Sequence, residues 1–367
     1  MEKTTTPDLQ SLVDSTTVFK GAEDSPLLAP RGVFLTNGKL LVADTAQNRL
    51  FIWNSIPTTE HQPADIVLGQ EGKSATGRNA GGGASASSLF YPSGIWSDGQ
   101  KLIVGDAWNH RVLIWLKFPT KDGQAADVVI GQRDFIGNDP NVEGISHSPT
   151  AHSLNWPYGV YSDGEQLRIA DTGNRRVLYF EQIPTENFAA ANKVIGKPNF
   201  SERDYNHHDP IWPYSVKIGP NGEMAIADTQ YYRILLWKDW QTATEQKADV
   251  IIGQASFEGN GQNQFGWFPK ANTLNWCYDT CFYQNGLWVA DTGSSRILWF
   301  EQLPEEHDTP ADNVLGQDDF TTGSENKNTI WSTEESLYWP FQVCIEGQTM
   351  VAADTGNHRI VINQLNF

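Results

Sequence analysis

The chain has 367 residues, of which 39% are hydrophobic and 11% aromatic, enough for a large buried core. Its formal net charge of −18 disfavours binding to the phosphate backbone of nucleic acids. Three cysteines do not make a disulfide framework, and no run approaches the roughly 18 apolar residues of a membrane-spanning helix.

The first 14 residues are polar and lack the apolar stretch of a signal peptide. Together with the few cysteines, this predicts a cytoplasmic protein with reduced thiols, no membrane contact and no nucleic-acid partner. A secreted chain from which the leader had been trimmed would look similar. We expect one domain over residues 1–367, with a polar tail at 1–15.

A β-prone run at Thr16–Gly21 follows this tail, and a repeated phrase then begins. The phrase reads Val/Ile-Ala-Asp-Thr-Gly-Asn-x-Arg, and it occurs six times in clear or looser copies. Its aspartates are 57 to 65 residues apart, namely Asp44, Asp106, Asp171, Asp228, Asp291 and Asp354. Its arginines are Arg49, Arg111, Arg176, Arg233, Arg296 and Arg359. A fixed period of this size indicates stacked copies of one supersecondary unit.

One copy, residues 154–200, shows what the unit contains. Residues 155–161, 166–170, 176–180 and 193–196 are β-prone runs, separated by the turns Ser-Asp-Gly and Asp-Thr-Gly-Asn and by a short loop. Four antiparallel strands of this kind form a meander. The sixth copy ends after its third strand, and the run at Thr16–Gly21 can supply the fourth. We therefore predict an all-β six-bladed β-propeller with four-stranded antiparallel blades, the last blade closed by an N-terminal strand.

The ADTGNHR core, preceded by xPxGV and a DG turn, resembles the NHL repeat over about residues 16–367. This resemblance implies a six-bladed NHL β-propeller. It does not imply one function, because such propellers include enzymes, sensors and binding modules.

The six repeated aspartates and arginines are predicted to be structural, because every blade needs them. We expect each aspartate to cap its turn, and each arginine to satisfy carboxylate and backbone acceptors between sheets. The sequence contains no HExxH or CxxC pairing, Walker loop or GxSxG elbow.

The copies differ most in the loops that lead from one fourth strand into the next first strand. These loops have about 12 to 21 residues against the usual 2 to 6. They leave equivalent points of each blade, so they share one face, where we expect function. Four histidines lie in them, and two of these, His152 and His207, are candidate ligand-binding residues. The alternative is that the loops only shield the channel.

Aromatic residues also gather where each innermost strand begins. The position before a proline, which the fifth copy replaces with Cys277, holds Ala29, Tyr91, Trp156, Trp212, Trp276 and Trp339. The position after it holds Arg31, Ser93, Tyr158, Tyr214, Tyr278 and Phe341. One interpretation is that these rings are wedges between blades. The other is an aromatic-walled pocket for an apolar, cyclic or cationic small molecule.

The next position reads Gly32, Gly94, Gly159, Ser215, Asp279 and Gln342. Asp279 stands out because a carboxylate at the crowded mouth of the central channel needs a partner that offsets its loss of hydration. Arg31 is one candidate partner. A buried structural bond is one explanation of Asp279. A catalytic acid or base, acting with Tyr278, Tyr158 or Tyr214, is the other.

Two functions follow from these features. The first is a binding propeller that presents the mouth and the long loops to a small molecule or a protein. Its candidate residues are Arg31, Tyr91, Trp156, Tyr158, Trp212, Tyr214, Trp276, Trp339, Phe341, Gln342, His152 and His207. The second is a lyase, hydrolase or condensing enzyme acting on an apolar or cyclic substrate, with Asp279 and Tyr278 catalytic. We predict no cofactor and no metal, because the mouth positions hold no histidine and only one carboxylate.

Overall fold

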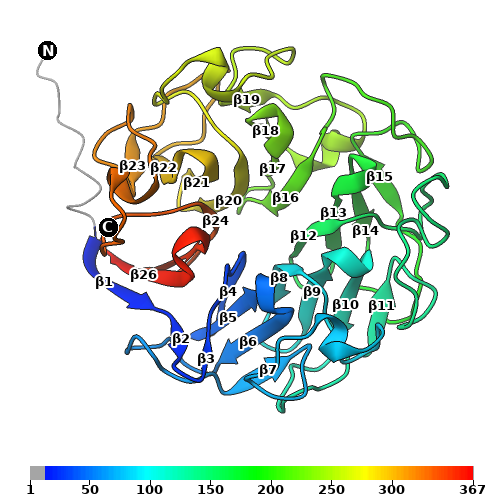
Figure 1. Cartoon of the computed structure of the whole chain (residues 1–367). Helices are drawn as coiled ribbons and strands as arrows, with labels where there is room; N and C mark the ends of the chain where they lie inside the picture. The colour runs from blue at the N-terminus through cyan, green and yellow to red at the C-terminus, as the bar shows by residue number, and fades with distance from the viewer. Residues whose placement is uncertain (1–12, 367) are drawn as a thin grey trace, which may run out of the picture.

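A computed structural model describes residues 13–366, and its strands form six four-stranded antiparallel sheets arranged in a ring (Figure 1). Blade 1 contains β4 (Gly32–Thr36), β5 (Lys39–Asp44), β6 (Arg49–Trp53) and β7 (Ile66–Leu68). Blade 2 contains β8 (Pro92–Ser97), β9 (Leu102–Asp106), β10 (Arg111–Trp115) and β11 (Val128–Ile130). Blade 3 contains β12 (Pro157–Ser162), β13 (Leu167–Asp171), β14 (Arg176–Phe180) and β15 (Lys193–Ile195).

The other blades repeat this order. Blade 4 contains β16 (Pro213–Ile218), β17 (Met224–Asp228), β18 (Arg233–Trp237) and β19 (Val250–Ile252). Blade 5 contains β20 (Cys277–Tyr283), β21 (Gly286–Asp291), β22 (Arg296–Phe300) and β23 (Asn313–Leu315). Blade 6 contains β24 (Pro340–Glu346), β25 (Thr349–Asp354), β26 (Arg359–Leu365) and the N-terminal β1 (Val13–Phe19). The predicted six-bladed propeller is therefore confirmed.

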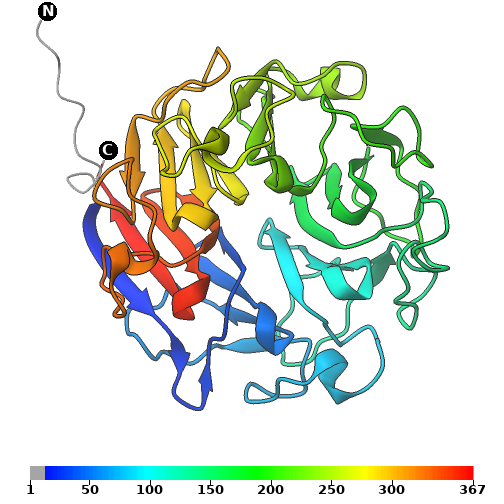
Figure 2. The same ribbon diagram turned by 45° about the horizontal axis from the view of Figure 1, so that its top comes forward.

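Closure of the ring by the N-terminal strand is also confirmed. β1 pairs antiparallel with β26, with Thr17 opposite Ile362 and Val18 opposite Val361, and the two strands lie side by side in Figures 1 and 2. The strand begins at Val13, before the expected limit of the polar tail at residue 15, and residues 1–12 lie outside the described residues. A short hairpin, β2 (Gly21–Ala22) and β3 (Ser25–Pro26), then leads into blade 1.

Short 3₁₀ turns join the second and third strands of every blade. They are η2 (Thr45–Gln47), η4 (Ala107–Asn109), η5 (Thr172–Asn174), η6 (Thr229–Tyr231), η9 (Thr292–Ser294) and η11 (Thr355–Asn357). Four more lie in connecting loops, namely η3 (Arg78–Gly81), η7 (Trp240–Thr244), η8 (Gln262–Phe265) and η10 (Glu325–Asn328). In an up-and-down meander, the second-to-third turns lie on the same face as the long loops. We call this side of the ring the loop-rich face.

The hydrophobic core lies between neighbouring blades. One cluster joins Val42 and Phe51 of blade 1 to Ile360 and Ile362 of blade 6, all at most 3% exposed. Equivalent clusters join blades 1 and 2, 2 and 3, 3 and 4, 4 and 5, and 5 and 6. Because each sheet buries both faces against its neighbours, its strands are near-continuous apolar runs.

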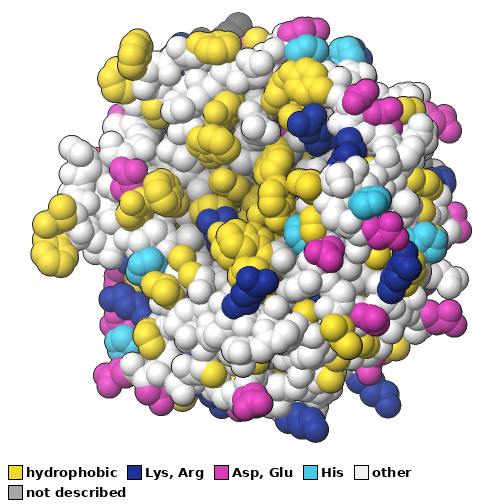
Figure 3. Space-filling view, turned by 45° about the vertical axis from the view of Figure 1, so that its right-hand side comes forward, with side chains coloured by type: hydrophobic (Ala, Val, Ile, Leu, Met, Phe, Trp, Pro, Cys, Tyr) yellow, Lys and Arg dark blue, Asp and Glu magenta, His cyan; other side chains and the backbone are white. Residues whose placement is uncertain are grey.

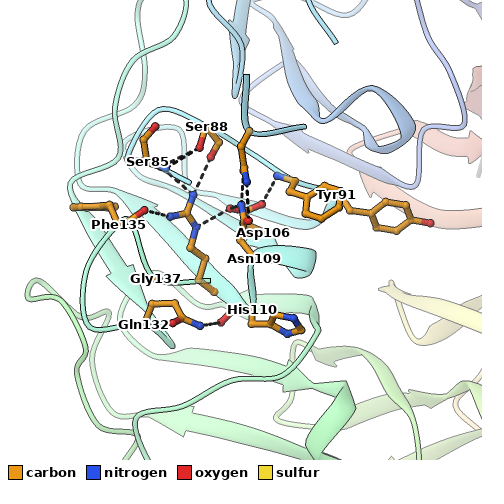
Figure 4. Close-up of polar contacts among 12 residues, drawn as sticks. Ser85, Ser88, Tyr91, Asp106, Asn109, His110, Gln132, Phe135 and Gly137 are labelled. Atoms are coloured by element: carbon orange, nitrogen blue, oxygen red, sulfur yellow. Dashed lines mark hydrogen bonds and ion pairs between the residues drawn. The ribbon is translucent and has the colours of Figure 1, made fainter. Parts of the chain in front are cut away.

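The repeated aspartate and arginine form a buried ion pair in every blade, with Nε to Oδ2 distances of 2.6 to 2.8 Å. In blade 2, Asp106 Oδ1 accepts the backbone N–H of Phe90 at 2.7 Å (Figure 4). Arg111 donates to the carbonyls of Ser85 and Ser88 in the loop before the blade, and of Phe135 in the loop after it. We call this arrangement the loop clamp.

The structural interpretation of the repeated pair is supported, but the expected capping is wrong. In blade 2, the Asp106 carboxylate does not cap a backbone N–H of the turn that follows it. Its carboxylate instead reaches back 16 residues to the chain entering the same blade, and pairs with Arg111 and Asn109. The turn is formed by backbone geometry, with His110 in the left-handed region at φ 52°.

Removing one member of a loop clamp should destabilise the fold strongly. Arg111→Met leaves the Asp106 carboxylate buried and without its cation, which typically costs about 3–5 kcal/mol. We expect the double variant Asp106→Asn/Arg111→Met to lose less than the sum of the two single losses. Urea unfolding measures each value. Arg133→Ala, at an exposed ion pair in the same loop region, is the control and should leave the Tm unchanged. Equal Tm values for Arg111→Met and the wild type would contradict a structural clamp.

Candidate functional site

The innermost strands begin around the central channel, and their first residues form two aromatic layers. The outer layer, which we call the aromatic crown, consists of Tyr91, Trp156, Trp212, Trp276 and Trp339. Trp276 and Trp339 are 40% and 43% exposed. Tyr91 stacks on Trp108 with ring centroids 4.4 Å apart, and Trp156 lies 6.0 Å from Trp212. Tyr91 and Trp108 belong to the same blade, whereas Trp156 and Trp212 belong to neighbouring blades.

Four crown residues adopt positive φ, from 51° to 58°, which is uncommon for non-glycine residues and costs backbone strain. Bonds between blades hold them there. Tyr91 N–H donates to Asn48 Oδ1, and Trp156 N–H donates to His110 Nδ1, both at 3.1 Å. Burial lowers the pKa of His110 to about 4, so its ring stays neutral and Nδ1 can accept this bond. Sequence reasoning did not assign His110 this role.

The inner layer closes the channel, and we call it the aromatic plug. Tyr158 stacks on Tyr214 at 4.5 Å, Tyr214 meets Tyr278 edge-on at 4.5 Å, and Tyr278 lies 4.2 Å from Phe341. The Arg31 guanidinium lies over Phe341 at 4.2 Å and over Tyr91 at 4.9 Å. The free space left beside these residues is about 10 Å³, room for one water molecule. In this conformation the predicted pocket is filled by its own side chains.

Burial keeps the hydroxyl groups around the plug protonated. It raises the pKa of Tyr91 to about 12 and raises the pKa values of Tyr158 and Tyr278 as well. The pKa of Arg31 is also raised: burial opposes its charge, but the phenol groups of Tyr214 and Tyr91 outweigh that effect. At neutral pH the mouth therefore holds one guanidinium and several neutral O–H groups.

Asp279 lies beneath the plug and is 1% exposed. Its Oδ1 is 3.5 Å from Lys217 Nζ, and its Oδ2 accepts the backbone N–H of Val343 at 3.3 Å. Burial raises the pKa of Asp279, against the attraction of Lys217. Burial also opposes the charge of Lys217, but Asp279, followed by the nearby thiols, outweighs it and raises the pKa of that lysine.

The partner of Asp279 is thus Lys217, and the expectation of Arg31 is wrong. Arg31 lies in the layer above and packs on rings instead. Lys217 could have been found from the sequence, because it stands two residues after Ser215 on a strand and so shares its channel-facing side.

Packing between blades explains why the position of Asp279 and Gln342 in blades 5 and 6 is glycine in blades 1 to 3. A Cβ on Gly94 would lie 2.6 Å from the carbonyl oxygen of Tyr158 in the next blade, so no side chain fits there. Between blades 5 and 6, and between blades 6 and 1, a side chain bridges the gap instead. Gln342 Oε1 accepts the N–H of Val33 at 2.7 Å, as Asp279 does from Val343. Asp279 and Gln342 therefore connect blades.

The two candidate histidines lie away from the mouth. His152 stacks on Phe188 at 4.8 Å, and its Nδ1 lies 2.8 Å from the carbonyl oxygen of that residue. The backbone N–H of Phe188 in turn donates a hydrogen bond to the carbonyl oxygen of Val129 in β11, the outermost strand of blade 2. His207 lies 5.2 Å from Tyr205, in the loop before blade 4. The structure does not bring these histidines together with Arg31 or Asp279.

In the part of the chain that the structure describes, the large exposed hydrophobic side chains gather on the loop-rich face. Among the described residues, every exposed large hydrophobic side chain lies in a segment entering an innermost strand or in the turn η4. They are Leu28, Trp108, Ile136, Ile145, Tyr205, Phe265, Trp267, Phe268, Trp276, Ile330, Trp331 and Trp339. Figure 3 shows hydrophobic side chains gathered around a hollow and at protruding loops.

The most exposed of them belong to two loops, which sequence reasoning missed. Phe265, Trp267 and Phe268 are 80%, 95% and 73% exposed in the loop before blade 5, and Ile330 and Trp331 are 86% and 76% exposed in the next loop. The two loops lie against each other: Gly323 of the loop before blade 6 is so near Pro269 of the loop before blade 5 that an added Cβ would lie 3.1 Å from the proline ring. We call these five side chains the apolar loop tips. The sequence signal was the run Phe-Gly-Trp-Phe-Pro in a segment with few apolar neighbours.

Within residues 13–366 no three His, Cys, Asp or Glu side chains group closely enough to hold a metal ion. In the same part of the chain no helix has the length and apolar character needed to cross a bilayer.

Comparison with known proteins supports the fold and leaves the family open. No protein-family model matches the chain, and no curated protein matches it. Hydrazine synthase of Kuenenia stuttgartiensis is similar in structure, with a TM-score of 0.50 and 10% identity over 92% of this chain and 96% of that chain. A catalytically inactive virginiamycin B lyase from Staphylococcus aureus, solved with quinupristin, gives a TM-score of 0.47 and 10% identity over 96% and 99%. At 10% identity the likeness to hydrazine synthase shows the fold alone.

The pair of Lys217 and Asp279 should stabilise the junction of blades 4, 5 and 6. Asp279→Ala leaves a buried ammonium without its carboxylate, and we expect a loss of about 3–5 kcal/mol. Lys217→Met/Asp279→Asn removes both charges and keeps an acceptor for Val343, so we expect it to lose less than Asp279→Ala. Urea unfolding of these variants, with Lys217→Met and Asp279→Asn as single variants, completes the double-mutant cycle. Additive losses across the set would contradict direct coupling of the two side chains.

Proposed function

We propose that this protein is a binding propeller of the NHL type whose loop-rich face docks a partner with an apolar surface. The single observation that carries this proposal is the one-sided distribution of exposed apolar side chains. Large apolar patches on soluble proteins mark interaction sites more often than chance exposure does. Long loops on a rigid scaffold are also where binding residues concentrate.

The chemistry of the loop before blade 5 supports an apolar contact. Residues 255–275 contain one acidic and one basic side chain, Glu258 and Lys270, in a chain with a net charge of −18. Charge repulsion is therefore weak where the apolar loop tips project. Aromatic side chains of this kind dominate the energetics of protein interfaces, because each buries a large area.

The enzymatic alternative, with Asp279 as acid or base and Tyr278 beside it, has less support. Asp279 is enclosed below the aromatic plug, and its two oxygens face Lys217 and the Val343 N–H. The space at this level is that of one water molecule, so a substrate would need Tyr214, Tyr278 and Phe341 to move apart.

The proposed NHL type is supported by the six ADTGN-type turns and by the loop clamp that each of these turns carries.

Affinity capture from native cell extract tests the proposal. The loop variant is Phe265→Ser/Trp267→Ser/Phe268→Ser, and the control is Gln100→Ala/Glu165→Ala, at exposed turns on the opposite face. We expect wild type and control to retain the same partner after cross-linking, and the loop variant to retain at least tenfold less. Equal Tm values would show that all three proteins are folded.

Two results would contradict this function. One is retention of the same partner by the loop variant and the wild type, which would place binding elsewhere. The other is loss of the partner from the opposite-face control alone.

A further inference from the structure

The centre of the loop-rich face holds a cation that no carboxylate compensates. Arg31 has no acidic side chain within 4 Å among the described residues, whereas all six clamp arginines pair with an aspartate. Arg31 as a whole residue is partly exposed, at the mouth of the channel above the aromatic plug. The rings of Tyr91 and Phe341 lie against it and fix its position.

The surrounding cavity is positive in an acidic protein. Its charged lining residues are Arg31 above the aromatic plug and Lys217 and Asp279 below it; the latter two pair with each other, so the net charge of +1 resides on Arg31. The whole chain carries −18. A positive cavity with low-dielectric aromatic walls concentrates the field and attracts anions.

Neutral hydrogen-bond donors surround the same point. The hydroxyl groups of Tyr158, Tyr214 and Tyr278 belong to the plug that lines this cavity. Tyr214 Oη lies 3.4 Å from Ser93 Oγ, and Tyr158 Oη accepts a hydrogen bond from Trp108 Nε1–H at 3.2 Å. A phenol that accepts from an indole still has its own hydrogen to donate. Tyr158 can therefore donate to an oxygen above it.

We propose that the channel mouth is a carboxylate-binding subsite, in which Arg31 holds one carboxylate group of the bound partner and the aromatic crown holds the apolar part beside it. This inference rests on the proposed binding function, and it specifies the chemistry at the centre of that face. A planar guanidinium and a carboxylate pair through two parallel hydrogen bonds. Tyrosine hydroxyls supply further donors without adding charge.

The charge balance favours a carboxylate over a phosphate. A net charge of +1 at the mouth is matched by one monoanion, whereas a phosphate dianion would leave one negative charge uncompensated beside the aromatic rings. The carboxylate can belong to a small apolar acid or to the C-terminus of a peptide. Both sources present the same group to Arg31, and the experiment separates them.

Isothermal titration with defined probes tests this subsite. The small-acid pair is 3-phenylpropionate and its uncharged amide, and the peptide pair is acetyl-Gly-Phe with a free or an amidated C-terminus. Benzyl phosphate is the phosphate probe. We expect a carboxylate probe to bind the wild type about tenfold to hundredfold more tightly than its amide. The pair that shows the larger ratio identifies the source.

Three variants locate the binding. Arg31→Gln should lose the preference for carboxylate over amide, and Arg31→Lys should keep part of it, because a charge remains without the planar fork. Arg133→Gln, at an exposed arginine of the same face, should bind as the wild type does. Equal Tm values would show that the variants are folded.

Four outcomes would overturn the proposal. They are no binding of either carboxylate probe at millimolar concentration, equal binding of acid and amide, unchanged preference in Arg31→Gln, and tighter binding of benzyl phosphate. Each would leave the docking function intact if partner capture still depended on the apolar loop tips, so the two proposals fail separately.

Discussion

The buried pair of aspartate and arginine is the interaction on which the rest of the structure depends. In each blade the carboxylate holds the chain that enters the innermost strand, and the guanidinium holds long-loop carbonyls. Blade 2 shows both, because Asp106 holds Phe90 while Arg111 holds Ser85 and Phe135. Taking two charges out of water is costly, and the additional hydrogen bonds offset that cost. The clamp bonds the long loops, which differ between blades, to sheets that are the same in every blade. Loops of different length can therefore be attached to one scaffold.

Because the loop clamp is the same in every blade, the differences between blades lie on the loop-rich face. The strands bury both of their sides between blades, and the aromatic plug fills the axis, so little of the interior is free to differ between blades. Crown residues such as Tyr91 and Trp156 keep strained backbone angles because side chains of the preceding blade, Asn48 and His110, bond to them. Backbone strain, exposed aromatic rings and an uncompensated arginine meet on the loop-rich face. Their coincidence points to recognition there.

The sequence predicted the propeller, its six blades and its closure, because each repeat contains enough local pattern to define four strands. It failed where a contact joins repeats that are distant in the chain. Sequence reasoning expected a local cap in place of the bond from Phe90 N–H to Asp106, and it named Arg31 as one candidate partner of Asp279 but not Lys217. Side-chain alternation on β16 contained the signal for Lys217. Exposure of Trp267 depends on how a loop stands on the surface, and loop composition alone does not determine that.

If the loop-rich face is the functional face, it should be covered when the protein is among its native partners. Hydroxyl-radical footprinting, performed on the purified protein and on the same protein in native cell extract, measures this directly. We predict that oxidation of Trp267, Phe268 and Trp331 falls severalfold in extract, while residues in the turns of the opposite face are modified equally in both samples. Unchanged oxidation of these three side chains, or protection limited to the opposite face, would contradict a docking role for the loop-rich face.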